Sequence, residues 1–115
     1  MDPNLVGVWQ YQKDAKESWT VRADGTLRWF YQGAPAIGIS DSIVEYTYRA
    51  DITKSPAHLD LIHQGVMGTS YFIYEVTGDE LRIGMAADGS AASNRAKAFG
   101  PNDRYYKRVQ AEPGK

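Results

Sequence analysis

The chain has 115 residues, no cysteine and a net charge of −1 at pH 7, from 13 basic and 14 acidic residues. This length suits one domain, predicted over residues 1–115 with its core over 5–109 and a short flexible tail over 110–115. The composition excludes disulfides and thiolate chemistry, gives no one-signed footprint for nucleic acid, and contains no apolar run near the ~18 residues of a membrane span.

The first predicted strand contains a glycine followed two residues later by a tryptophan, Gly7 and Trp9. Glycine lets a neighbouring backbone approach closely, and an indole suits the closed floor of a small barrel. A late arginine can lie over the indole face, a contact of about 0.5–2 kcal/mol. Arg95 and Arg108 are the candidates, with Arg104 as a third, and we assign Arg108, in the last predicted strand, to the floor. The first and last strands are therefore expected to meet, with Gly7, Trp9 and Arg108 as structural floor residues.

Apolar and polar side chains alternate with a period of two through most of the chain, the pattern of strands with one buried face. Residues 18–22 and 27–32 flank a turn at Gly25 and form the clearest hairpin. No helical apolar spacing is sustained. Further strands are predicted over 44–49, 58–64, 70–76, 81–85, 96–99 and 104–109. The pattern predicts an all-β fold, a small antiparallel up-and-down β-barrel of about eight strands, whose lumen is either filled or holds one small ligand.

Two segments lack this alternation. Residues 33–42 are rich in small residues and long for a hairpin loop, and residues 86–95 are small and polar. Loops of this kind are frequent carriers of function. We expect them to be rim or lid segments at the open end.

Four motifs recur together along the chain: Leu5-x-Gly7-x-Trp9, Pro56-x-x-Leu59-Asp60-Leu61, Ile73-Tyr74-Glu75-x-x-Gly78-Asp79-x-Leu81-x-Ile83 and Arg95-x-x-x-Phe99. As a set they resemble a family of small bacterial lipocalin-like domains of about this length. That family usually has proline after the arginine, where this chain has Ala96. The resemblance implies a lipocalin/calycin-like barrel with an internal pocket at its open end. It implies no activity, because fold does not determine function.

Aromatic side chains on one predicted face are the candidate ligand-binding residues of the lumen: Trp29, Tyr31, Tyr46, Tyr48 and His63. Apolar walls with a few polar tips are typical of small-molecule pockets. The plainer alternative is that these rings simply fill a narrow barrel.

The titratable residues form no recognisable catalytic set, and no catalytic residue is assigned. His58 and His63 lie five apart on one predicted strand, so they face opposite ways and cannot share a metal. We expect no cofactor. Glu75 shares a face with Tyr71 and Ile73, and would be a buried acid with a raised pKa if that face were inward. Asp60 is expected on the outer face, paired with an arginine.

Three functions remain open. The first is non-catalytic binding of a small apolar or aromatic molecule at the open end. The second is a protein–protein interaction, such as protease inhibition, through residues 33–38, or a homodimer through outward-facing Phe30 and Phe72. The third is a cavity-type isomerase or cyclase. The N-terminus lacks the features of a signal peptide, so we expect a cytoplasmic protein or an exported one whose signal has been removed.

Overall fold

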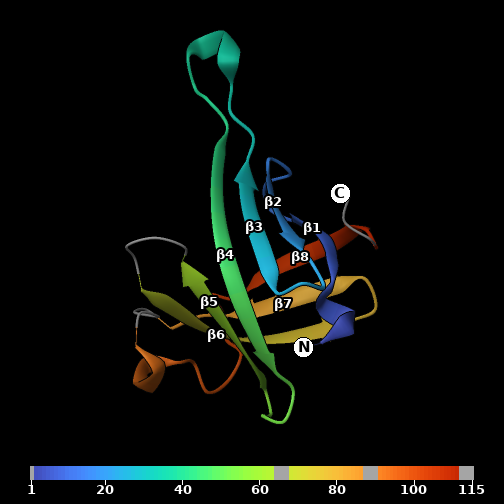
Figure 1. The fold of residues 1–115 in the computed structure, drawn as a ribbon, viewed down its shortest axis with the longest axis vertical. Coiled ribbons are helices and arrows are strands. Elements are labelled where there is room, and N and C mark those ends of the chain that lie inside the picture. The colour runs from blue at the N-terminus through green and yellow to red at the C-terminus, as the bar shows by residue number, and fades with distance from the viewer. Residues whose placement is uncertain (1, 64–67, 87–90, 112–115) are drawn as a thin grey trace.

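In the described part of the chain, eight antiparallel strands close into a single barrel (Figure 1). The structure is a computed structural model and describes residues 2–63, 68–86 and 91–111. The strands are β1 (Gly7–Tyr11), β2 (Glu17–Val21), β3 (Thr26–Tyr31), β4 (Ser42–Asp51), β5 (Ala57–His63), β6 (Thr69–Thr77), β7 (Glu80–Gly84) and β8 (Arg104–Gln110). Each pairs with the next in sequence, and β8 returns to β1. This is the expected all-β, up-and-down, lipocalin-like architecture.

The only helical segments in the described part of the chain are three short 3₁₀ turns, η1 (Pro3–Leu5), η2 (Pro35–Ile37) and η3 (Ala92–Asn94). The predicted tail and the predicted loop over 86–95 are only partly described, because residues 112–115 and 87–90 lie outside the described ranges. Residue 110, assigned to the tail from sequence, belongs to β8.

Strand register explains which side chains enter the barrel. Trp9 is opposite Trp19, Trp19 is opposite Trp29, and Trp29 is opposite Val44. Residues directly opposite in neighbouring strands share a face of the sheet. One row of large side chains therefore crosses β1 to β4 on the inner face.

One end of the barrel is closed by packed side chains. Its residues with no exposed surface are Leu5, Trp9, Val21, Leu27, Leu59 and Leu81. The indole Nε1 of Trp9 donates a hydrogen bond to the Leu5 carbonyl at 2.8 Å, which holds η1 under the barrel. Gly7 adopts φ +149°, and a Cβ there would lie 2.9 Å from the Gln110 carbonyl oxygen. Only glycine permits this close approach of β1 and β8. We call this end the floor.

Arg108 is the arginine that lies over Trp9. Its guanidinium carbon is 4.4 Å from the indole ring centre. Two of its nitrogens donate to the carbonyls of Val6 and Asn4, each at 2.8 Å. A cation–π contact and two charge-assisted hydrogen bonds thus tie the last strand to the segment that closes the floor.

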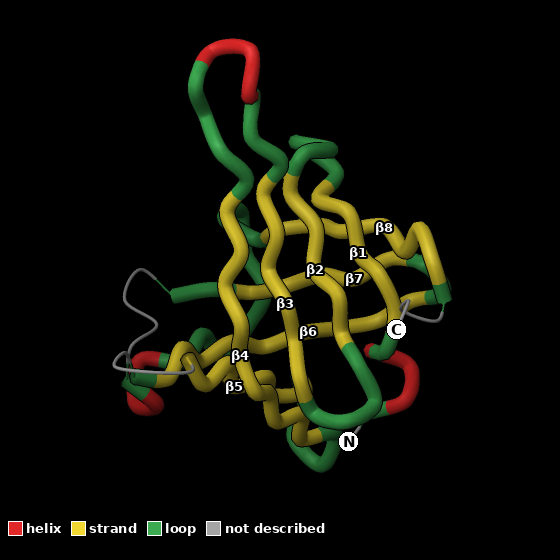
Figure 2. Tube along the Cα trace, turned by 45° about the horizontal axis from the view of Figure 1, so that its top comes forward, coloured by secondary structure: helices red, strands yellow, loops and turns green. Residues whose placement is uncertain are grey.

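Two connections extend beyond the barrel wall. The β3–β4 connection, which contains η2, projects away from the barrel (Figures 1 and 2). The segment from η3 to β8 runs along the outside of the sheet. Residues 96–99, predicted as a strand, form none. Instead, the Phe99 ring lies 4.4 Å from the guanidinium of Arg82, so side-chain packing replaces strand pairing there.

Candidate functional site

The barrel holds a cavity of about 310 Å³ in its upper half, away from the floor. Aromatic and aliphatic side chains dominate its lining: Trp19, Trp29, Val44, Tyr46, Leu61, Phe72, Ile83 and Met85, with Ser70 and Arg104 as further polar members. This volume lies at the lower end of the ~300–1,000 Å³ range of small-molecule sites. The lumen is therefore filled at the floor and hollow at the open end.

Two of the five predicted lumen residues, Trp29 and Tyr46, line this cavity. Tyr31 stacks on Trp29, with ring centres 6.2 Å apart, and its hydroxyl donates to Asp14 at 3.2 Å. His63 makes an edge contact with Tyr46 at 5.4 Å. Neither Tyr31 nor His63 belongs to the lining.

Tyr48 lies deeper, in the buried core. Its side chain is 6% exposed, and its hydroxyl donates to the Arg22 carbonyl at 2.7 Å. Strand alternation placed this residue on the correct face. Its depth along the barrel axis depends on the shear between strands, which alternation does not show.

Several lining residues were missed from sequence, and one was misplaced. Phe72, expected on the outer face, points inward, because it is opposite Leu59, a fully buried inner residue. The predicted outward position of Phe72 is therefore wrong, while a homodimer stays a prediction. Tyr74 shares the inner face with Phe72, so Glu75, the next residue on the strand, points outward and is exposed. The prediction of a buried acid at this position is therefore also wrong.

Arg104 is the one charged residue among the described side chains of the lining. Its Nη2 is 3.0 Å from Oε1 of Glu17, whose side chain is 9% exposed. The other oxygen of that carboxylate, Oε2, accepts from the Tyr106 hydroxyl at 3.0 Å. The guanidinium also lies 4.0 Å from the Tyr11 ring centre. The cation at the cavity wall thus has a built-in counter-ion, Glu17, behind it.

The pKa shifts at this end follow from burial and from these partners. Burial opposes the charge on Arg104, but Tyr106, Tyr11 and Glu17 together outweigh that effect, and its pKa is raised. Burial raises the pKa of Tyr46. A tyrosine phenol is protonated at neutral pH, so Tyr46 adds a hydrogen-bond donor to the lining residues.

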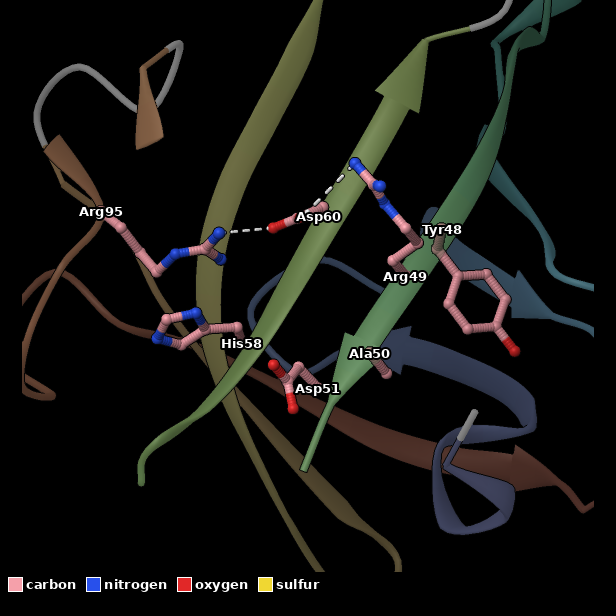
Figure 3. A pocket seen from close by; sticks show the side chains of 7 residues that line it. All are labelled: Tyr48, Arg49, Ala50, Asp51, His58, Asp60 and Arg95. Carbon is pink, nitrogen blue, oxygen red and sulfur yellow. Dashed lines mark hydrogen bonds and ion pairs between the residues drawn. The ribbon is translucent and has the colours of Figure 1, made fainter. Parts of the chain in front are cut away.

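A second pocket, of about 470 Å³, lies on the outer face of β4 and β5 (Figure 3). Asp60 is central to it and contacts Arg95 at 2.6 Å and Arg49 at 3.8 Å. Figure 3 shows Tyr48 pointing to the opposite side of β4 from these charges. The expected pairing of Asp60 with an arginine is present twice.

Arg95 connects several groups on the outer face. Besides Asp60, its guanidinium donates to the Phe72 carbonyl at 2.8 Å and lies 5.1 Å from the Tyr71 ring centre. Arg95 therefore fastens the segment after η3 to β5 and β6. Burial, Arg95 and Lys54 together lower the pKa of His58, which faces this side. We assign this cluster to holding the outer segment in place.

The described residues offer no metal centre, since no group of three or more His, Asp or Glu side chains lies at ligand spacing among them. His58 borders the outer pocket, while His63 contacts Tyr46 of the inner face, as their spacing predicted. Nor does any helix among residues 2–63, 68–86 and 91–111 have the length and apolar character needed to cross a membrane.

Comparison with known proteins adds no relative. No protein-family model matches the chain, and neither the curated proteins nor the solved structures contain a match. The resemblance of the four motifs to lipocalin-like domains stays a prediction.

Proposed function

We propose that this barrel is a non-catalytic binding protein that holds one small apolar or aromatic molecule in the cavity at its open end. The observation that supports this most is the contrast in filling. The floor is packed, whereas the same inner face leaves about 310 Å³ between aromatic walls further up. Apolar walls at an open pocket face water in the free protein, and a ligand that covers them removes this apolar surface from water, which favours binding.

The walls suit a flat, largely apolar ligand. Trp19, Trp29 and Phe72 supply ring surfaces, and burying apolar area stabilises a complex by about 25 cal/mol per Å² before the costs of association. Ser70 and Tyr46 add hydroxyl groups that orient the ligand. An isomerase or cyclase acting in the same cavity stays a prediction that rests on shape alone.

Filling the cavity tests the proposal. N-phenyl-1-naphthylamine, an uncharged dye that fluoresces in apolar sites, is the probe. Val44→Phe places a ring in the cavity and is expected to weaken dye binding at least about tenfold, since the ring occupies the ligand's volume. Ile43→Phe is the matched control, because Ile43 is the neighbouring residue on β4, 54% exposed on the other face.

Retained dye binding in a folded Val44→Phe variant, or absence of binding in the wild type, would contradict the proposal. Thermal unfolding with and without the dye provides an independent readout, because a ligand that binds only the folded state raises its stability by RT ln(1 + [L]/Kd).

A second candidate function, binding of a protein partner, is favoured by one observation. The β3–β4 connection projects from the barrel and carries Ile37, which is 74% exposed, and Ile39, which is 50% exposed (Figure 2). Exposed apolar residues on a protruding loop suit insertion into a partner's cleft. Replacing both by Asp is expected to abolish partner capture without unfolding the barrel, and retained capture would exclude this loop.

A further inference from the structure

The charge pair at the cavity wall indicates which class of ligand the lumen accepts. An arginine inside a binding cavity normally favours an anion, because a guanidinium binds a carboxylate through charge-assisted hydrogen bonds. In this barrel that partner is already supplied by the chain. Glu17 accepts from Arg104 with one oxygen and from Tyr106 with the other, both at 3.0 Å.

We propose that the Glu17–Arg104 pair makes the cavity selective for uncharged ligands and that Glu17 is the residue that excludes carboxylates. This inference rests on the proposed binding function and specifies its ligand class. The favoured molecule has an aromatic or apolar body and a neutral polar group such as an amide, a ketone or a hydroxyl.

An anionic ligand faces two obstacles in this geometry. To bind Arg104 it must either displace Glu17, whose side chain is only 9% exposed, and so leave a buried carboxylate without its cation, or share the guanidinium with Glu17 and bring two negative charges close together. If it leaves the pair intact, the ligand's own charge enters an apolar cavity without a counter-ion. Both routes disfavour a carboxylate relative to a neutral molecule of the same shape.

A cationic ligand is also disfavoured. Both oxygens of Glu17 are engaged, and Arg104, not Glu17, is the member of the pair that reaches the cavity lining. A cationic ligand would therefore be repelled by the Arg104 guanidinium. An uncharged polar group avoids both penalties and finds the hydroxyls of Tyr46 and Ser70 in the lining.

The test uses two ligands of nearly identical shape, 2-naphthamide and 2-naphthoate, which displace N-phenyl-1-naphthylamine from the wild-type protein at neutral pH. The amide is expected to bind at least about tenfold more tightly than the carboxylate. In Glu17→Gln the guanidinium loses its counter-ion, so naphthoate is expected to gain at least about tenfold relative to the amide.

Two further variants assign the effect to Arg104. Glu17→Gln combined with Arg104→Gln removes both charges and is expected to lose the gain in naphthoate binding. Glu45→Gln is the matched control. It changes the net charge equally, but Glu45 pairs with Arg28 away from the cavity lining, so the amide-to-carboxylate ratio should stay at the wild-type value.

The outcomes separate this inference from the function on which it rests. If the dye binds but wild-type protein prefers naphthoate or treats both ligands alike, the inference is wrong and the binding function stands. If folded Glu17→Gln keeps the wild-type ratio, Glu17 is not the discriminating residue and the inference is also wrong. If the dye and both ligands fail to bind, the proposed function itself is contradicted. Should Glu17→Gln fail to fold, the wild-type ratio decides alone.

Discussion

The floor and the open end of this barrel use the same type of side chain for different purposes. At the floor, Trp9 has no exposed surface and its indole donates to the Leu5 carbonyl. At the open end, Trp19 and Trp29 line a cavity, and Trp29 is only partly buried. Tryptophan thus fills the lumen at the floor and lines the cavity at the open end. The difference teaches that stability and binding are separated along the barrel axis.

Removing a tryptophan from each region is the strongest way to break this comparison. Trp9→Ala is expected to lower the free energy of unfolding by about 3–5 kcal/mol, because it leaves a large void in a packed region. Trp29→Ala should lower the free energy of unfolding by clearly less, because the Trp29 ring already borders the cavity. Urea denaturation of both variants measures this. Equal losses would show that the two ends are not energetically distinct.

Arg108 tests the fastening of the floor. Arg108→Met keeps most of the aliphatic stem but removes the two hydrogen bonds to Asn4 and Val6 and the contact with the Trp9 ring. A loss of about 2–3 kcal/mol in the free energy of unfolding is expected. Arg49→Met, at a side chain that is 71% exposed, is the control and should change stability by less than about 0.5 kcal/mol. Similar losses in the free energy of unfolding at both positions would show that Arg108 does not stabilise the floor.

Alkaline pH probes the two regions through their tyrosines. Burial and the hydrogen bond to Asp2 strongly raise the pKa of Tyr74 above its ordinary value of 10.0, whereas burial alone raises that of Tyr46. Because the folded-state pKa exceeds the unfolded one, the contribution is complete below pH 10 and is lost as the pH rises above it. Denaturant midpoints should fall above that pH. Tyr74→Phe should flatten this fall more than Tyr46→Phe, and the reverse order would contradict the assignment.

The outer face provides the smallest expected effect. Arg28 and Glu45 form an ion pair on β3 and β4 whose side chains are 42% and 37% exposed. Such pairs contribute about 0–1 kcal/mol because solvent screens them. Glu45→Gln should therefore shift the unfolding midpoint only slightly. A loss comparable to that of Arg108→Met would show that the wall, rather than the floor, carries much of the stability.

Much of the fold was predictable because it depends on local patterns. Alternation located the strands, and Gly25 located the first hairpin turn, where the structure has φ +90°. The meeting of β1 with β8 was predictable from Gly7 and Trp9, since their chemistry suits a close approach and a plug. Arg108 could be proposed as the cation but not separated from Arg95 and Arg104, whose partners lie on distant strands.

The candidate site was only partly predictable, for two physical reasons. Strand β6 carries apolar residues on both faces, and Ile73 on its outer face is buried, at 1% exposure. The alternation of apolar and polar residues therefore cannot show to which face Phe72 points. The Glu17–Arg104 pair joins residues 87 positions apart in the chain. Such a contact depends on the barrel's closure and shear, and no local motif signals it.

A ligand that enters the open end should leave the floor undisturbed, and the three tryptophan indoles report on this directly. In ¹⁵N-labelled protein each indole N–H gives its own NMR signal, and N-phenyl-1-naphthylamine can be titrated against all three. We expect the signals of Trp19 and Trp29 to shift with the same binding curve while that of Trp9, bonded to the Leu5 carbonyl, stays in place. A shift confined to Trp9, or no shift at Trp19 and Trp29 while the dye binds, would contradict the account.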